Sequence, residues 1–353
     1  MKILAINPGS TSTKIAVYEN EKRLFVKTFY HSIETLSPFP TINSQYEFRK
    51  ELILAELKKE DVLFLFDAVV GRGGLLKPIP SGVYEVNETM LKDLRNASMQ
   101  HASNLGGLLA EDISRSIPGC KAYIADPVVV DELEDVARIS GLPMLPRVSI
   151  FHALNHKAVG RKYARSINKN YEKMNLVIAH LGGGISVAAH RCGRVIDVNN
   201  ALNGSGPFSP ERAGTLSARA LAELCFSGKY SLQEIDKMIC GKGGVMAHLG
   251  TTDMPAVIKK INDGDANAEL IVDAMIYTVA KEIGSMCVSL RGNVDAIILT
   301  GGIAYNSYCV DRLIGQIDFL APIHIFPGED EMEALAFNAL EALQGNIVCK
   351  VYN

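Results

Sequence analysis

One local pattern occurs twice in this chain and limits what it can fold into: an apolar run, a turn, and a second apolar run. Residues 3–6 (ILAI) are followed by turn formers and then by the apolar residues 15–18. Residues 176–179 (LVIA) lead into three consecutive glycines and then into the apolar residues 185–189. Short apolar runs bounded by turn residues are typical of buried strands. The repeat predicts two strand–turn–strand units, and hence two similar halves that face each other across a cleft.

The tip of the first hairpin carries groups that suit an anionic ligand. It offers an amide, hydroxyls and an ammonium group, from Asn7, Ser10, Ser12 and Lys14. With the backbone N–H donors of the turn, these groups suit a cluster of anionic oxygens and its metal ion. The alternative is an ordinary hairpin rich in serine and threonine, which would be preferred if this stretch stood alone.

Glycine turns follow apolar strands in the second hairpin and again after residues 296–299. Glycine lets the backbone turn tightly and approach a ligand closely. These turns are therefore candidate ligand-binding turns, and the family resemblance described next implies that they bind a nucleotide through Gly182, Gly183, Gly184, Gly301, Gly302 and Asn306.

Several segments together resemble a known enzyme family. Residues 151–156 (FHALNH), 179–186 (AHLGGGIS) and 299–306 (LTGGIAYN) are similar to segments of the carboxylate kinases of the acetate kinase family. Residues 69–86 and 326–336 are most similar to the butyrate kinases of that family. The resemblance implies an α/β fold with two related ribonuclease-H-like, actin-like domains and a nucleotide cleft between them. This is the fold of the acetate/sugar kinase, actin and chaperone ATPase superfamily.

The 353 residues are enough for two domains. We expect an N-terminal domain of residues 1–148 plus 334–353, and a C-terminal nucleotide-binding domain of residues 149–333. The proline-rich stretch at residues 142–146 is the predicted boundary. We also expect the domains to close on the nucleotide by hinge motion.

Two cations lie beside the second hairpin in the sequence. His180 comes directly before the triple glycine, a position that suits binding of a transferring group, although a lone histidine is usually a core residue. Arg212 ends the long irregular segment 199–213, before a helix predicted at residues 215–226. A surface arginine is the alternative. The resemblance implies that Arg212 contacts the phosphoryl group.

Three further residues are catalytic candidates. Arg72 follows an apolar strand predicted at residues 62–70, and it would either clamp a carboxylate or phosphate or simply face solvent. Asp126 ends another predicted strand; the resemblance implies an active-site role, and a helix-capping Asp is the alternative. His152 shares a helix face with His156, and the resemblance implies that it lies beside the substrate.

The expected substrate is a short-chain acid. Gly73 and Gly74 stand where acetate kinases have bulkier residues, so we expect their missing side chains to open volume in the acyl pocket. By the resemblance, Phe151 also lines this pocket. The resulting prediction is butanoate, with the branched acid isobutyrate as the alternative.

The resemblance implies ATP/ADP and Mg²⁺ as cofactors. Asn7 and Glu331 are the predicted metal-associated residues, and Glu329 and Asp330 are the alternatives to Glu331. The predicted reaction is reversible in-line transfer of the ATP γ-phosphoryl group to the acid, giving ADP and an acyl phosphate. The sequence has no G-x-x-x-x-G-K-[ST] loop, so this would be a phosphotransferase of another class. The rival hypothesis is an actin-like ATPase switch without an acid substrate.

Composition excludes several other classes. A net charge of −3 and a pI near 6.3 give no reason to expect nucleic acid as a partner. We find neither a signal peptide nor an apolar run long enough to cross a membrane. The seven cysteines are scattered and contain no C-x-x-C, which is typical of a reducing compartment. We expect a cytoplasmic enzyme that forms a homodimer or a larger homo-oligomer and binds small-molecule carboxylate and nucleotide.

Overall fold

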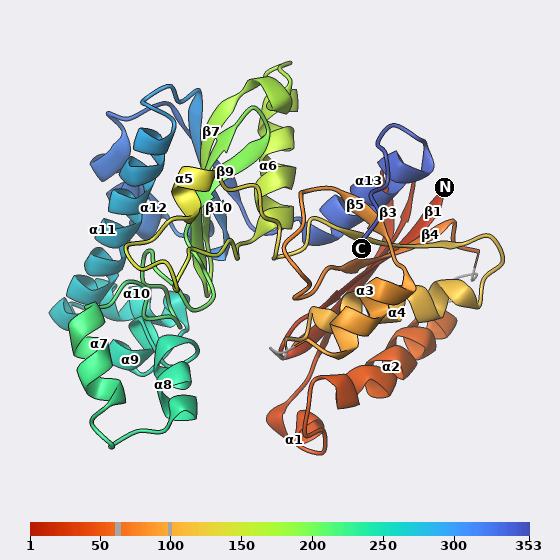
Figure 1. Ribbon diagram of the computed structural model, residues 1–353, viewed down its shortest axis with the longest axis horizontal. Coiled ribbons are helices and arrows are strands. Elements are labelled where there is room, and N and C mark those ends of the chain that lie inside the picture. The colour runs from red at the N-terminus through yellow and green to blue at the C-terminus, as the bar shows by residue number, and fades with distance from the viewer. Residues whose placement is uncertain (61–64, 98–100) are drawn as a thin grey trace. The chain divides into compact units, whose positions relative to one another are not determined.

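The computed structural model describes residues 1–60, 65–97 and 101–353 and contains two compact α/β units (Figure 1). Unit 1 comprises residues 1–130 and 330–353, and unit 2 comprises residues 131–329. The segment 131–148, which we expected in the first domain, lies with unit 2. The reason is local: Glu132 accepts hydrogen bonds from Lys157 Nζ at 2.7 Å and from the Val195 amide at 2.9 Å.

The strands of unit 1 are β1 (Lys2–Pro8), β2 (Ser12–Glu19), β3 (Lys22–Tyr30), β4 (Ala68–Arg72), β5 (Val83–Glu85) and β6 (Lys121–Ala125). Those of unit 2 are β7 (Asn175–Leu181), β8 (Ile185–Arg191), β9 (Arg194–Val198), β10 (Ala296–Gly301) and β11 (Ile323–Pro327). The strand predicted at residues 62–70 is thus observed as β4, and its residues 62–64 lie outside the described part of the chain.

The helices of unit 1 are α1 (Ile33–Leu36), α2 (Tyr46–Lys59), α3 (Glu88–Arg95), α4 (Asn104–Arg115) and α13 (Glu331–Leu343), with a 3-10 turn η1 (Asn43–Gln45). Those of unit 2 are α5 (Asp135–Arg138), α6 (Ala153–Ser166), α7 (Ala218–Cys225), α8 (Leu232–Ile239), α9 (Val245–Leu249), α10 (Met254–Asn262), α11 (Ala266–Ser289) and α12 (Ser307–Ile317), with 3-10 turns η2 (Tyr171–Lys173) and η3 (Gly302–Tyr305).

Both units contain the same five-strand arrangement. In unit 1 the strand order is β3-β2-β1-β4-β6-β5, where β1 pairs antiparallel with β2 and parallel with β4. In unit 2 the order, taken from the opposite edge, is β9-β8-β7-β10-β11, where β7 pairs antiparallel with β8 and parallel with β10. The hairpin repeat in the sequence therefore marks the first two strands of two topologically equivalent sheets, as predicted.

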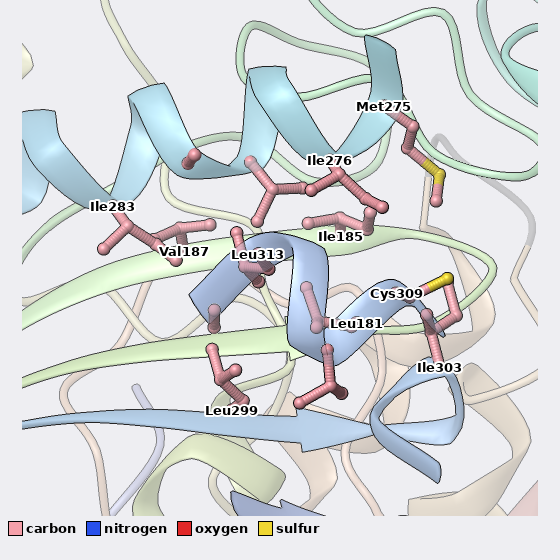
Figure 2. Close-up of a cluster of buried hydrophobic side chains, with 14 of the residues drawn as sticks. Leu181, Ile185, Val187, Met275, Ile276, Ile283, Leu299, Ile303, Cys309 and Leu313 are labelled. Carbon is pink, nitrogen blue, oxygen red and sulfur yellow. The ribbon is translucent and has the colours of Figure 1, made fainter. Parts of the chain in front are cut away.

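Alternate strand residues divide each sheet between two layers of helices. In unit 2, Val177, Ala179 and Leu181 belong to the core that faces α11, whereas Leu176 and Ile178 belong to the core that faces α6. Figure 2 shows the α11 side, where Ile276 and Ile283 point from the helix towards Ile185 and Val187 on β8. This alternation follows from the two-residue period of a strand, and it decides which face receives each functional side chain.

The C-terminal segment is anchored in the core of unit 1. Tyr352 is buried, and its hydroxyl donates to Asp93 Oδ2 at 2.7 Å and accepts from the Lys77 amide at 3.2 Å. Asn87 Nδ2 donates to the Tyr352 carbonyl at 2.8 Å. Since α13 also packs on β1 and β4, residues 330–353 are part of the unit that residues 1–130 begin.

Within the described residues, no helix is long and apolar enough to span a bilayer.

Candidate active site

Three predicted phosphate-binding residues lie on one face of the unit 1 sheet. Leu4, Ile6, Ile15 and Val17 belong to the apolar core on the side of α2 and α4. By alternation, Asn7, Ser12 and Lys14 lie on the other face, and Asn7 pairs directly with Lys14 across β1 and β2. Ser10 lies at the exposed turn between the strands.

Glu331, although far from Asn7 in the sequence, lies beside it on the same face of the unit 1 sheet. Asn7 Nδ2 donates to Glu331 Oε2, and Arg72 Nη1 lies 3.1 Å from that oxygen. Arg72 Nη1 also donates to Asn7 Oδ1 at 3.4 Å. The Glu331 side chain is 6% exposed and that of Arg72 is 19% exposed, so the solvent-facing alternative for Arg72 is wrong. Of the three acidic candidates, Glu331 is the one that contacts Asn7.

A glycine contact sets the position of Arg72. Arg72 ends β4, and the preceding Gly71 faces α4, where a Cβ atom would lie 2.1 Å from the Gly106 carbonyl oxygen. Conversely, a Cβ on Gly106 would lie 2.1 Å from the Arg72 carbonyl oxygen. Because neither residue has a side chain, α4 packs directly on β4, while Arg72 points to the opposite face.

Asp126 holds a turn at the end of β6. Its Oδ1 accepts from Ser81 Oγ at 2.6 Å and from the Gly82 amide at 2.8 Å, and the side chain is buried. Its φ of +40° lies in the left-handed region, which aspartate tolerates better than most residues. Asp126 caps none of the described helices, so the helix-capping alternative is wrong. Its catalytic role stays a prediction.

The open volume expected beside Gly73 and Gly74 is not present. A Cβ on Gly73 would lie 2.5 Å from Pro127 Cβ, and a Cβ on Gly74 would lie 2.5 Å from Asn104 Oδ1. The space that the missing side chains leave is therefore filled by neighbouring residues and is not open to a ligand. The Asn104 side chain also accepts from the Leu75 amide at 2.8 Å, which fixes this turn.

In unit 2, His180 is held through its Nδ1 atom, whereas its buried Nε2 has no hydrogen-bond partner among the described residues. It lies at the end of β7 on the face towards α6, where its Nδ1 is 2.9 Å from Asn155 Oδ1. Since an amide oxygen only accepts, Nδ1 carries a proton, and Nε2 is the nitrogen directed at a ligand or a neighbour. Glu329 Oε1 lies 3.0 Å from Nε2. From the sequence, Asn155 was recognised only as part of the segment FHALNH and Glu329 only as an alternative metal-associated acid, so their contacts with His180 were not predicted.

His152 lies against His180. The two rings stack with centroids 3.8 Å apart, and His152 Nδ1 is 2.9 Å from Ser186 Oγ. His152 directly precedes α6, and its stacking on His180 was not among the expectations from the sequence. Phe151 is buried, and its ring packs edge-on against His156 at 5.2 Å. Its role in an acyl pocket stays a prediction.

A Cβ atom added at each of the three consecutive glycines would contact a different side chain. A Cβ on Gly182 would lie 3.0 Å from His180 Nε2, and one on Gly183 would lie 3.3 Å from Glu211 Oε1. A Cβ on Gly184 would lie 1.9 Å from Arg212 Nη1. The run GGG therefore leaves room for the two candidate cations on either side of one turn.

The loop that carries Arg212 is fastened to this turn. Ser209 Oγ donates to the Gly183 carbonyl at 2.5 Å, and the buried Asn199 accepts from the Val187 amide of β8 at 2.8 Å. Arg212 Nη1 donates to the Ala201 carbonyl, and Arg212 Nε is buried without a hydrogen-bond partner among the described residues. A donor of this kind is costly to bury and is commonly satisfied by a ligand or water.

The third turn has two distinct glycines. Gly301 has φ of +89°, and a Cβ there would lie 2.5 Å from the Leu181 carbonyl oxygen, so glycine is required for structural reasons. Gly302 is exposed, and a Cβ there would meet nothing within 4 Å. Asn306 caps α12 by accepting from the Cys309 amide at 3.1 Å. Their contact with a nucleotide stays a prediction.

Behind the stacked pair, a line of hydrogen bonds continues into the core of unit 2. His156 Nε2 is 2.9 Å from Ser186 Oγ, His156 Nδ1 is 3.3 Å from His190 Nε2, and Tyr171 Oη is 2.7 Å from His190 Nδ1. The three hydrogen bonds need one proton each, and these protons can be placed so that both histidine rings are neutral. Burial holds the pKa values of His156 and His190 well below the usual value of 6.5.

The lowered pKa values of His156 and His190 predict that the folded protein is less stable in mild acid. Their folded pKa values lie below the unfolded value of about 6.5, so the unfolded chain binds protons first as the pH falls. The free energy of unfolding should therefore decrease below about pH 6.5, by up to about 1.4 kcal/mol per pH unit for each histidine. Urea unfolding at pH 7.5, 6.5 and 5.5 measures this, and His190→Gln should make the pH dependence shallower. An unchanged slope in that variant would contradict the assignment.

No cluster of three or more His, Cys, Asp or Glu residues that could hold a metal ion occurs in residues 1–60, 65–97 and 101–353. The pair formed by Asn7 and Glu331 offers an amide and a carboxylate, which are oxygen ligands of the kind that Mg²⁺ accepts alongside water and phosphate. The donor set is compatible with a magnesium ion that arrives with a nucleotide.

Comparisons with known proteins identify the family of this chain. The model of the acetokinase family matches residues 146–325. A probable butyrate kinase from Bacteroides thetaiotaomicron is 59% identical over 352 residues, covering 100% of both chains. Butyrate kinase 2 from Clostridium acetobutylicum is 54% identical over 353 residues, covering 99% of both chains.

Solved structures confirm the predicted fold class. The crystal structure of Porphyromonas gingivalis acetate kinase matches with a TM-score of 0.79 at 20% identity, over 97% of this chain and 99% of that one. A propionate kinase from Francisella tularensis matches with a TM-score of 0.77 at 19% identity, over 96% and 98% of the two chains. At these identities the structural matches show the fold alone. The family model and the full-length relatives show more: the chain belongs to the acetokinase family.

Proposed function

We propose that this protein is a short-chain carboxylate kinase that reversibly transfers the γ-phosphoryl group of ATP to butanoate, giving ADP and butanoyl phosphate. The observation that carries the proposal is the identity of 50–59% with relatives named butyrate kinase, which extends over at least 99% of the chain. The site chemistry is consistent with it. Arg72, His180 and Arg212 are cations or donors, as transfer between two anions requires.

The acid substrate needs no general base. A carboxylic acid with a pKa of about 4–5 is ionised at neutral pH, so it is already a nucleophile. The difficulty is to bring this anion close to the phosphates of ATP. In the proposed mechanism, Arg212 and His180 contact the oxygens of the transferring phosphoryl group, and the charge of Arg212 stabilises them. Asn155 keeps His180 in the orientation that directs Nε2 at that group, and Arg72 binds the carboxylate.

We propose that Mg²⁺ is held by Asn7 and Glu331, partly through water, and that it supplies charge neutralisation on the phosphates when bound. In this proposal, Ser10, Ser12 and Lys14 bind phosphate oxygens. Glu331 would exchange its contact with Arg72 for the metal, and this exchange would release Arg72 for the acid.

The test is chemical trapping of the product. The purified protein is incubated with ATP, Mg²⁺, butanoate and hydroxylamine, and butanoyl hydroxamate is measured. A signal that depends on both ATP and butanoate supports the kinase. ATP hydrolysis that butanoate does not change, with no hydroxamate, would support the actin-like ATPase switch instead.

The choice of acid gives a separate prediction. Each additional buried CH₂ group contributes about 0.8 kcal/mol, or roughly fourfold in kcat/KM. The kcat/KM for butanoate should therefore exceed that for acetate by roughly tenfold or more. Isobutyrate has a volume similar to that of butanoate, so this reasoning does not rank the two acids. Measurement of kcat/KM for acetate, propionate, butanoate, isobutyrate and valerate decides the point. A maximum at acetate would contradict it.

We further propose that the enzyme is cytoplasmic and forms a homodimer or a larger homo-oligomer. Helix α11 supports association, because Leu270, Tyr277 and Val288 on it are 65%, 57% and 76% exposed. Light scattering after size-exclusion chromatography measures the assembly directly.

A further inference from the structure

A buried arginine lies behind the tip of the first hairpin. Arg49 on α2 is 0% exposed. Its Nη1 donates to the Ser12 carbonyl at 2.7 Å and to Thr13 Oγ1 at 2.9 Å, and its Nη2 lies within 3.5 Å of the Ser10 carbonyl. Thr13 faces the side of the sheet opposite to Ser12 and Lys14, so Arg49 contacts the hairpin from behind.

These contacts use the carbonyl groups of the turn. The Thr11 carbonyl, between the two that Arg49 contacts, accepts from the His31 amide at 2.8 Å. In the described residues, no acceptor is found for the amide hydrogens of Ser10 and Thr11, and both residues are exposed. With carbonyl oxygens engaged from behind and amide hydrogens available at the tip, the turn has the polarity of an anion-binding site.

The charge of Arg49 is not balanced by an acid among its contacts in the described chain. Its remaining partner is Gln45 Oε1, at 2.8 Å from Nη2 and 3.2 Å from Nε, which is also neutral. Burial lowers the pKa of Arg49 to about 10, which still leaves it protonated at neutral pH. Burial, and then the charge of Arg49, lower the pKa of His31, as expected for a ring beside a cation without a counter-ion.

A buried cation without a counter-ion is energetically costly, and its cost falls when an anion binds nearby. We propose that Arg49 is a positioning residue for the nucleotide phosphates: it fixes the hairpin turn with its amide hydrogens outward, and its charge favours an anion at the tip. This inference rests on the proposed function, because it takes the phosphates of ATP and ADP as the anion. It adds a residue that acts through the turn and that no motif in the sequence indicates.

The test separates phosphate binding from folding. The dissociation constants of ADP and of adenosine are measured for the full-length wild type, Arg49→Lys and Arg49→Met. Lys50→Met is the matched control, because Lys50 is the next residue of α2 but pairs with Glu47 and Asp112 at 2.8 and 3.0 Å. Thermal unfolding of each variant checks that it is folded.

Removal of Arg49 should weaken ADP binding by about tenfold, the size expected for one charge-assisted interaction, and leave adenosine binding within about twofold. Arg49→Lys keeps the charge but not the two-pronged contact, so it should show a smaller loss in the same direction. The control should bind both ligands as the wild type does. If the Met variant does not fold, the Lys variant carries the test.

An unchanged ratio of ADP to adenosine affinity in a folded Arg49 variant would overturn the inference and leave the proposed kinase function standing. If the wild type bound ADP no more tightly than adenosine, the hairpin would not be a phosphate site. That result would overturn both the role of Arg49 and the proposed kinase function.

Discussion

Replacement of Arg212 by alanine is expected to lower kcat by a factor of about 10²–10³, the usual cost of losing one preorganised charge donor. The guanidinium lies against the triple-glycine turn beside His180, and its buried Nε has no partner in the described residues. Its contribution should therefore be made to the ligand and not to the folded state. The measurement is steady-state kinetics with ATP and butanoate, together with the unfolding temperature.

A matched control removes a different arginine from the same unit. Arg219 on α7 is 86% exposed at its side chain and pairs with Glu223 at 2.6 Å. Arg219→Ala should keep near-normal kcat, because an exposed pair contributes little. If Arg212→Ala retained similar activity, Arg212 would have no part in phosphoryl transfer.

Addition of a single methyl group at Gly184 should be nearly as damaging. In Gly184→Ala the new Cβ would lie 1.9 Å from Arg212 Nη1 and 2.4 Å from Arg212 Cζ. The guanidinium is the end of a flexible side chain, so it should move away at little cost in stability. Because a misplacement of about 1 Å can cost a factor of about 10², kcat should fall by roughly that factor while the unfolding temperature changes little.

A double-mutant cycle identifies the cause. If the methyl group acts by displacing Arg212, then Gly184→Ala should have little further effect in the Arg212→Ala background. Gly315→Ala in α12 is the control, because a Cβ there would meet nothing within 4 Å. Independent, multiplicative losses in the double variant would show that Gly184 acts by another route.

Sequence patterns predicted the parts of this molecule that depend on local chemistry. Apolar runs and turns located β1, β2, β7 and β8, and the repeat predicted two related sheets, because a strand and its turn are encoded by neighbouring residues. The metal-associated roles of Asn7 and Glu331 were predicted only with the help of the family resemblance, since the two residues lie at opposite ends of the chain, and their direct contact was not predicted.

Other features depend on tertiary contacts between residues that are distant in sequence, and a local sequence pattern does not encode such contacts. Arg49, Asn155 and Glu329 lie on a helix or a loop and contact residues that are distant in sequence. The helix predicted at residues 215–226 begins only at Ala218, with Ser217 before it, so Arg212 lies in the loop and not at a helix start. The expected open space beside Gly73 was wrong because the sequence does not reveal that Pro127 fills it.

The anchoring of residues 330–353 in unit 1 affects how the protein folds during synthesis. Unit 2 is one contiguous stretch, residues 131–329, whereas unit 1 needs α13 and the buried Tyr352 in addition to residues 1–130. Nascent proteins generally fold from the N-terminus, domain by domain. Here the N-terminal unit is translated first but can be completed only after the C-terminal residues are synthesised. Until then, the apolar strands β1 and β4 lack α13, the helix that covers one of their faces. A chaperone that binds nascent chains would find its main target in the first 130 residues.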